Sequence, residues 1–124
     1  MATSEIRSYR DLRVWQEGMD IAFACYQVTK TFPKEEMYGM TSQIRRAAAS
    51  IPANIAEGYG REYRAEYIQF LRIAQGSLKE LETHLLLAAR VELTTTQAIS
   101  PIIKLKESLG RMLRSLLRSL QDKT

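Results

Sequence analysis

Side chains that commonly act in catalysis are scarce in this chain, which has one histidine, His84, and one cysteine, Cys25. His84 follows Glu80 by one helical turn, an arrangement more typical of a structural pair than of a metal site. A di-iron helical bundle would need a Glu-x-x-His pair on each of two helices. No glycine-rich phosphate loop follows a predicted strand, and no recognisable turn places a nucleophile beside His84. We therefore predict no catalytic, metal or cofactor site and do not expect an enzyme.

Phosphate binding by basic side chains is the chemistry that remains. The chain carries 18 lysines and arginines against 14 acidic residues, a formal net charge of +4, and the whole excess lies after residue 93. A guanidinium group presents a planar fork suited to phosphate, and nearby tyrosines could stack on bases. Solvated helix faces often carry similar charges, so that alternative stays open. The candidate nucleic-acid-binding residues are Lys104, Arg111, Arg114, Arg118, Arg61 and Arg64.

A polar stripe around residues 43–57 is the second candidate site. Serine and asparagine form helix interiors poorly, yet Ser50 and Asn54 recur at helical spacing beside an apolar stripe. We expect these side chains to hydrogen bond with a neighbouring helix or subunit. The alternative is a network that only fixes the register of the helices. The candidate members of this interhelix or intersubunit network are Gln43, Arg45, Ser50, Asn54, Glu57, Ser77 and Glu80.

Four amphipathic segments must position these side chains. Apolar residues that recur every three or four positions predict helices over about residues 12–31, 35–58, 63–92 and 96–120. No segment shows the alternation of period two that is typical of a strand. Four such helices with short connections predict an all-α fold, an up-down-up-down antiparallel four-helix bundle.

Glycines and prolines give more detailed expectations about these helices. Gly58 and Gly60 are expected to end the second helix, and Pro52 should kink that helix without breaking it. Pro101 is expected in the first turn of the fourth helix, where its missing N–H costs nothing. The residues of the fourth helix expected to point inward are Ile99, Ile102, Leu105, Leu109, Met112, Leu116 and Leu120.

The length of 124 residues suits one domain over residues 1–124, with short flexible ends at residues 1–10 and 121–124. No apolar run reaches the length of a membrane span, and the first residues lead into no signal-like apolar core. We therefore expect a cytoplasmic protein without a membrane partner. Cys25 has no second cysteine to pair with, and its apolar neighbours predict a buried small side chain.

The third and fourth helices carry more apolar residues than one bundle core requires. The run Leu85-Leu86-Leu87 is apolar on nearly all sides of its helix, and this surplus predicts a homo-oligomer. Gly76 suggests the close approach of another backbone, because glycine destabilises a helix interior relative to alanine. The alternative for both features is a thick core within one chain.

Several motifs, in this order, resemble a family of bacterial four-helix-bundle proteins that are encoded in 23S rRNA intervening sequences. The motifs are Leu12-x-x-Trp15, Phe32-Pro33-x-x-Glu36-x-Tyr38-Gly39, Gln43-x-Arg45-Arg46-Ala47, Ser50-Ile51-x-x-Asn54-Ile55-Ala56-Glu57-Gly58 and Phe70-Leu71-x-x-Ala74-x-Gly76-Ser77-x-x-Glu80. The chain departs from the usual pattern at Met40 and Pro52. That family is similar in turn to the accessory variability determinant of diversity-generating retroelements, a homopentamer that binds nucleic acid and a reverse transcriptase. The resemblance implies a pentamer with a basic outer surface.

Two classes of function follow from these observations. In the first, the protein is a non-enzymatic oligomer that binds RNA or a ribonucleoprotein as an accessory factor. In the second, it is an oligomeric scaffold for a protein partner such as a polymerase, without direct contact to nucleic acid. The salt dependence of RNA binding separates the two classes, because each phosphate contact steepens the loss of affinity with salt.

Overall fold

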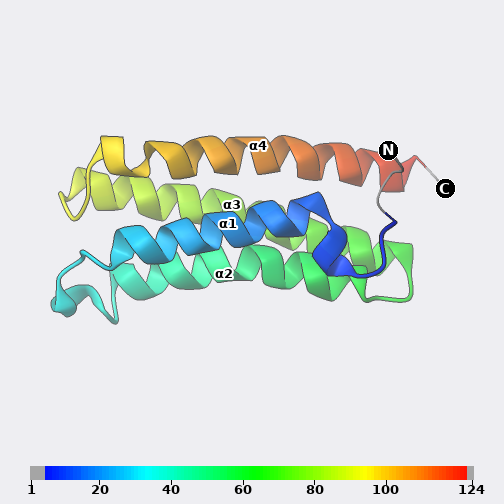
Figure 1. Cartoon of the computed structure of the whole chain (residues 1–124), viewed down its shortest axis with the longest axis horizontal. Helices are drawn as coiled ribbons and strands as arrows, with labels where there is room; N and C mark the ends of the chain where they lie inside the picture. Colours follow the sequence, from blue (N-terminus) through cyan, green and yellow to red (C-terminus); the bar gives the residue numbers. More distant parts are fainter. Residues whose placement is uncertain (1–4, 123–124) are drawn as a thin grey trace.

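The protein is a bundle of four helices, as seen in a computed structural model that describes residues 5–122. The helices are α1 (Arg13–Thr29), α2 (Met40–Tyr59), α3 (Arg64–Arg90) and α4 (Thr96–Gln121). They run side by side along the long axis and alternate in direction (Figure 1). Each helix packs on two neighbours, α1 on α2 and α4, and α3 on α2 and α4. Within the described residues there is no strand, so the prediction of an all-α four-helix bundle is confirmed.

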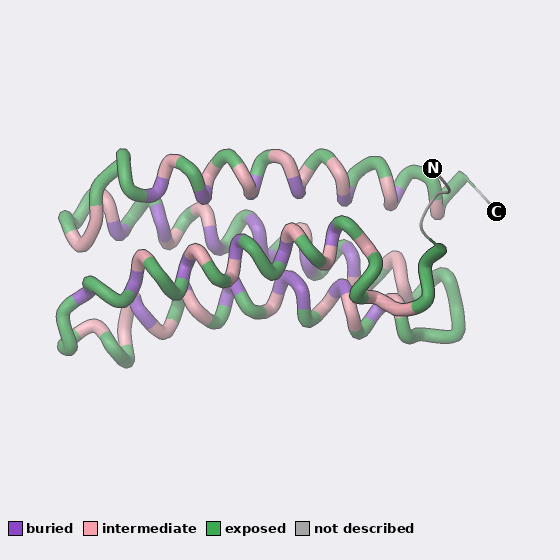
Figure 2. Tube along the Cα trace, viewed as in Figure 1, coloured by how far each residue is buried: buried purple, intermediate pink, exposed green. Residues whose placement is uncertain are grey.

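The core is a continuous apolar column along the axis of the bundle. Figure 2 shows buried residues recurring along all four helices and exposed residues between them. The largest side chains that are fully buried are Ile21, Ile44, Ile51, Ile55, Leu71, Leu81, Leu85, Ile99, Leu109 and Leu113. Cys25 is fully buried among them, as the sequence predicted.

The inward face of α4 differs from the prediction. Leu105, Met112, Leu116 and Leu120 are only partly buried and flank the core. Lys106 is absent from the predicted stripe because it is charged, yet it is buried, with its ammonium 2.8 Å from a carboxylate oxygen of Glu82 in α3. The residues that face the core are Ile99, Ile102, Lys106, Leu109, Leu113 and Leu117.

The start of α2 lies several residues later than predicted. Residues Lys34–Glu36 form a short 3-10 turn, η2, and α2 begins only at Met40. The carboxylate of Glu36 accepts a hydrogen bond from the backbone N–H of Met40 at 3.1 Å. Glu36 therefore satisfies a free N–H at the start of the helix from outside, rather than forming part of its first turn.

Gly60 caps the end of α2 as predicted, although not in a left-handed conformation, whereas Gly58 does not end the helix. Gly60 has a φ of −79°, and Gly58 lies inside the helix. A Cβ atom on Gly58 would stand 2.6 Å from the Cβ of Phe70, so the residue permits close packing of α2 on α3. The left-handed residue of the described chain is instead Glu92, with a φ of 68°, at the end of α3.

The two helical prolines occupy different environments. The first turn of α4 is capped by Thr95, whose hydroxyl accepts from the N–H of Ala98 at 3.0 Å. Pro101 therefore lies in the second turn, one turn later than predicted, and it is exposed to solvent. Pro52 is buried inside α2, which continues past it without a break. Its ring lies beside Gly18 of α1.

The segment before α1, part of which was predicted to be flexible, contains a short 3-10 turn. Residues Tyr9–Asp11 form a 3-10 turn, η1, capped by the hydroxyl of Ser8. The ring of Tyr9 meets the ring of Trp15 edge-on, with centroids 5.2 Å apart. Residues 1–4 and 123–124 of the predicted flexible ends lie outside the described residues. No helix of residues 5–122 is long and apolar enough to cross a membrane.

Candidate nucleic-acid interface

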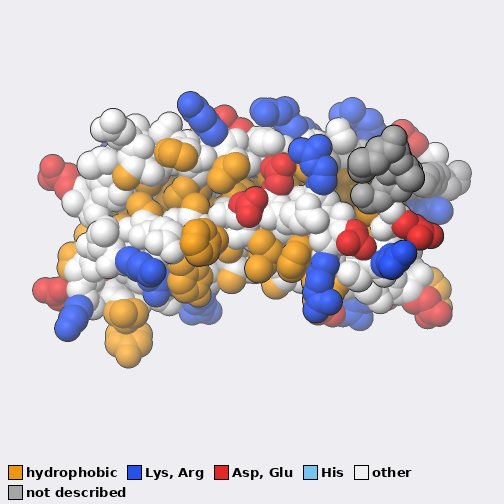
Figure 3. Space-filling model, in the orientation of Figure 1, with side chains coloured by type: hydrophobic (Ala, Val, Ile, Leu, Met, Phe, Trp, Pro, Cys, Tyr) orange, Lys and Arg blue, Asp and Glu red, His pale blue; other side chains and the backbone are white. Residues whose placement is uncertain are grey.

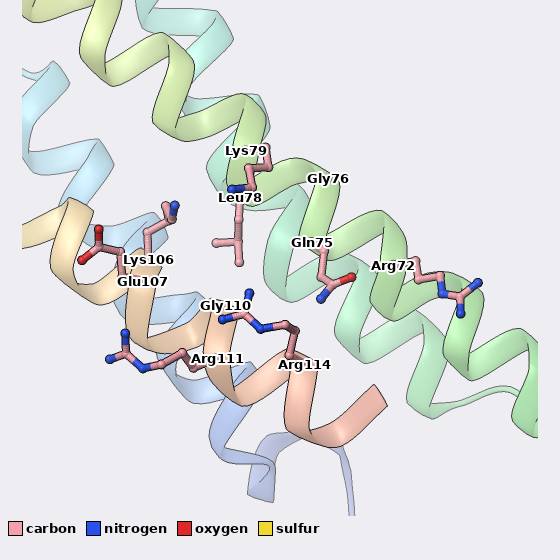
Figure 4. Close-up of a pocket in the computed structure, with 10 residues that line it drawn as sticks. All are labelled: Arg72, Gln75, Gly76, Leu78, Lys79, Lys106, Glu107, Gly110, Arg111 and Arg114. Atoms are coloured by element: carbon pink, nitrogen blue, oxygen red, sulfur yellow. The ribbon is translucent and has the colours of Figure 1, made fainter. Parts of the chain in front are cut away.

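A groove with a volume of about 600 Å³ lies between α3 and α4 (Figure 4). Because the two helices are antiparallel, the first half of α3 lies beside the second half of α4. Five of the lining residues are basic, and Glu107 is the only acidic one in this lining. The residues that line the groove are Arg72, Gln75, Gly76, Leu78, Lys79, Lys106, Glu107, Gly110, Arg111 and Arg114.

Four of these five cations are unpaired. Within residues 5–122, no hydrogen bond or ion pair of the side chain joins Arg72, Lys79, Arg111 or Arg114 to the rest of the protein. The fifth, Lys106, is neutralised by Glu82, and its side chain is only 9 % exposed. The unpaired positive charge therefore belongs to exposed side chains on both walls of the groove, where an anion could replace water as their partner.

Two glycines keep the groove open. A Cβ atom on Gly76 would meet no other atom within 4 Å, and one on Gly110 would touch only a methyl group of Leu78, at 4.0 Å. No other part of the described chain approaches Gly76, so the expected approach of another backbone could come only from a second copy and stays a prediction. Gly76 is exposed and borders the open groove.

The structure brings together only part of the predicted basic set. Arg111 and Arg114 line the groove, whereas Lys104 and Arg118 are exposed on α4 outside the lining. Arg64 is exposed as the first residue of α3, at the same end of the bundle as the end of α4 (Figure 1).

Arg61 is not free to bind in the same way. Its guanidinium is 2.9 Å from a carboxylate oxygen of Glu57 and lies over the ring of Phe70. Tyr59, one of the nearby aromatic residues, packs edge-on against Tyr67.

Sequence reasoning missed Arg72 and Lys79. These residues are seven positions apart in α3, so they lie on one stripe of the helix, immediately beside the core residues Leu71 and Leu78. The signal was present in the sequence, because an antiparallel pairing of the last two helices places this stripe beside Arg111 and Arg114. Which face of α4 points toward α3, however, depends on the rotation of α4 about its own axis. The burial of Lys106 shows that rotation.

The predicted polar network divides into separate contacts. The hydroxyls of Ser50 in α2 and Ser77 in α3 share a hydrogen bond of 2.6 Å, and Arg45 of α2 donates to Thr29 of α1 at 2.9 Å. The guanidinium of Arg45 also lies over the ring of Tyr26. These two contacts connect α2 with both of its neighbours.

The other predicted members of the network make no such contact between helices. Asn54 donates to the carbonyl of Ser50 within α2, and Gln43 is exposed. Glu57 pairs with Arg61, which lies just after the end of α2, and Glu80 pairs with His84 one turn further along α3.

Residues with catalytic side chains form no cluster in the described part of the chain. No group of three or more His, Cys, Asp or Glu residues there could hold a metal ion. His84 lies 3.3 Å from Glu80, and burial raises the pKa of Cys25 to about 12. A thiol with such a pKa stays protonated and is a weak nucleophile at neutral pH.

Exposed apolar side chains gather on two separate parts of the surface. The α1 patch consists of Met19, Phe23 and Tyr26, of which Phe23 is 66 % exposed. Apolar groups appear over α1 and between α1 and α4, with lysines and arginines along the edge formed by α4 (Figure 3). The α3 patch consists of Leu86, Leu87 and Val91, at the end of α3.

Comparison with known proteins points to one family. The family model described as "23S rRNA-intervening sequence protein" matches residues 10–115. The chain is also similar to a crystal structure from Bacteroides thetaiotaomicron, described as a protein with unknown function from the S23 ribosomal protein family. The two share 27 % sequence identity and a TM-score of 0.75, over 84 % of this chain and 97 % of the other. No curated protein matches the chain.

Proposed function

This chain belongs to the family of 23S rRNA-intervening sequence proteins, and we propose that it is a non-enzymatic, oligomeric accessory protein that binds RNA. The family membership that the sequence motifs suggested is thereby confirmed. The name of the family associates it with ribosomal RNA, and the similar crystal structure is described as a protein with unknown function. The proposal therefore depends on the surface of this chain.

The observation that carries the proposal is the set of four unpaired cations on the two walls of the α3–α4 groove, Arg72, Lys79, Arg111 and Arg114. A single surface cation attracts an anion only weakly, but the electrostatic potentials of several cations in one groove add together. RNA offers a row of phosphates that several such cations can contact together. Three arginines also favour phosphate as the ligand, because the guanidinium fork binds two of its oxygens at once.

Oligomerisation is the second part of the proposal, and the two apolar patches support it. The α1 patch and the α3 patch lie on different helices. Contact between the α1 patch of one copy and the α3 patch of the next would be heterologous, and such contacts form closed rings when the rotation between copies permits closure. The expected likeness to the accessory variability determinant of diversity-generating retroelements favours five copies. Repetition of the groove around a ring would add several equivalent sites for one RNA.

The test is the salt dependence of RNA binding, measured by fluorescence anisotropy with a labelled RNA oligonucleotide. A variant with Arg72→Gln, Arg111→Gln and Arg114→Gln should bind weakly, with a salt slope lower by about two units, because each contact to single-stranded RNA contributes about 0.7. The control variant is Lys30→Gln, Lys34→Gln and Arg46→Gln, which removes the same charge from exposed positions at the end of α1, in η2 and in α2, none of which lines the groove.

Light scattering of both variants separates loss of RNA binding from loss of assembly. Equal affinity and slope in the two triple variants would contradict RNA binding at the groove. It would favour the alternative of an oligomeric scaffold that binds a protein partner, such as a polymerase, through the apolar patches. A stable monomer at micromolar concentration would remove the oligomeric part of the proposal.

A further inference from the structure

We infer that the α3–α4 groove selects single-stranded over double-stranded RNA by receiving one unstacked base between its walls. This inference rests on the proposed function and names the form of RNA that the groove accepts. Its basis is the combination of a concave volume, a floor formed by the uncharged residues Gly76, Leu78 and Gly110, and unpaired cations around that floor.

The groove has the size of a ligand site. Its volume of about 600 Å³ falls within the range of roughly 300–1,000 Å³ that is common for small-molecule pockets. A base in an RNA duplex is stacked and paired, so a duplex presents mainly its backbone and 2′-hydroxyl groups to a protein. It could touch the cations at the rim of the groove but would leave the interior empty. Only an unpaired nucleotide can turn its base into such a site.

The floor of the groove suits the face of a base. Gly76 and Gly110 contribute no side chains, and a methyl group of Leu78 lies beside Gly110 as an apolar surface. Gly76 borders the groove, and no other atom lies within 4 Å of its Cβ position, so a larger side chain there has room to extend over the groove. A planar ring could therefore lie close to the backbone of both helices, because each contributes a glycine to the lining, and a longer side chain at either glycine would reduce this space.

Polar groups around this floor suit the rest of a nucleotide. Gln75 extends from α3 into the space between the helices, and Arg114 extends along the α4 side toward Gly110 (Figure 4). The amide of Gln75 supplies donors and an acceptor for the edge of a base, and the plane of a guanidinium group can stack on its face.

The spacing of the cations fits phosphates on both sides of the bound base. Arg72 and Lys79 stand before and after Gln75 and Gly76 in α3, about 10 Å apart along the helix axis at 1.5 Å per residue. The chain entering the groove and the chain leaving it would then each meet a cation.

The experiment compares a labelled single-stranded RNA with a duplex that contains the same strand. The unsubstituted protein should bind the single strand at least tenfold more tightly than the duplex. Gly76→Leu should fill the groove, reduce affinity for the single strand about tenfold, and leave duplex affinity and the salt slope unchanged, since every cation remains. Ala98→Leu is the matched control, because it adds the same side chain at an exposed position in the first turn of α4, away from the groove.

A second variant, Gln75→Ala, tests the same inference without the risk that a new leucine disturbs the fold. It enlarges the groove rather than filling it, and we expect a threefold to tenfold loss for the single strand alone. Equal binding of the two RNA forms, or unchanged single-strand affinity in both variants, would overturn the inference about the groove. The proposed function would survive that result if the triple arginine variant still lost affinity. If that variant also bound RNA as tightly as its control, the proposed function would fail as well.

Discussion

The hydroxyls of Ser50 and Ser77 share a hydrogen bond across 2.6 Å, joining α2 to α3 halfway along their interface. Ser77 is only 8 % exposed, so this polar contact lies at the edge of the core rather than on the surface. The Ser50 hydroxyl also lies 2.7 Å from the carbonyl of Ala47. Two serines of small volume thus let the helices pack closely while each hydroxyl retains a partner.

The Ser50–Ser77 contact predicts a non-additive pair of substitutions. Ser50→Ala should lower the free energy of unfolding by about 1 kcal/mol, because it leaves the buried Ser77 hydroxyl without this partner. The double variant Ser50→Ala, Ser77→Ala should be less destabilised than the sum of the two single variants, since no hydroxyl is left unpaired. Urea denaturation of the four proteins measures the coupling. Strict additivity would show that the contact contributes nothing of its own.

The close packing around Gly58 predicts that adding a single methyl group at this position lowers the stability of the protein. In Gly58→Ala the new Cβ would lie 2.6 Å from the Cβ of Phe70 and 3.3 Å from the backbone oxygen of Tyr67. Neither is the end of a flexible side chain, so α2 and α3 must separate, and overpacking of this kind costs about 1–3 kcal/mol. A drop in melting temperature tests it. A variant as stable as the parent would contradict the observed packing, since alanine is otherwise the better helix former.

Gly76 predicts the opposite result for the same substitution. It lies inside α3 with open space around its Cβ position. Gly76→Ala should therefore raise the free energy of unfolding by up to about 1 kcal/mol through the helix propensity of alanine. Thermal denaturation beside Gly58→Ala provides an internal control. Destabilisation would indicate that the glycine has a packing role, for instance against a second copy of the chain, and that the groove is not open in solution.

Glu92 predicts a stabilising substitution at the end of α3. Its φ of 68° lies in the left-handed region, and Leu93 N–H donates to the carbonyl of Ala88 at 2.9 Å in a Schellman motif. Glycine adopts this conformation without steric cost, so Glu92→Gly should stabilise the protein by about 0.5–1 kcal/mol. Chemical denaturation is the measurement. Glu92→Ala, which keeps a Cβ atom, is the control and should not show the gain.

The burial of Cys25 predicts that its thiol reacts only after the protein unfolds. Burial raises its pKa to about 12, whereas a thiol in an unfolded chain has a pKa of about 8.5. A disulfide reagent at about pH 8 should thus modify the folded protein very slowly and the denatured protein at once. Rapid modification of the folded chain would contradict the burial.

The same pKa difference fixes the sign of the pH dependence. At low pH the thiol is protonated in both the folded and the unfolded chain, so it contributes nothing to the pH dependence of stability. As the pH rises from about 9 toward 12, only the unfolded chain loses this proton, so stability should fall. Substitution with alanine, Cys25→Ala, should reduce that fall, as alkaline denaturation of both proteins would show.

The number, order and approximate extent of the helices follow from the sequence, because an apolar residue every three or four positions gives each helix one face to bury. The details that failed depend on neighbours in space. Hydropathy excluded Lys106 from the core of α4, although Glu82 of α3 makes its burial tolerable. Gly58 looked like a helix terminus, whereas the proximity of Phe70 gives it its role.

For the candidate site, too, some features follow from the sequence and others depend on neighbours in space. The sequence by itself determined the family, the four-helix fold and the surplus of basic residues near the end, among them Arg111 and Arg114. Only the tertiary structure decided that these arginines share a groove with Arg72 and Lys79 of α3, while Arg61 is engaged by Glu57. Periodicity along one helix records which face is apolar. The rotation of that helix against its neighbour, which brings distant charges onto facing walls, is fixed by packing between the helices.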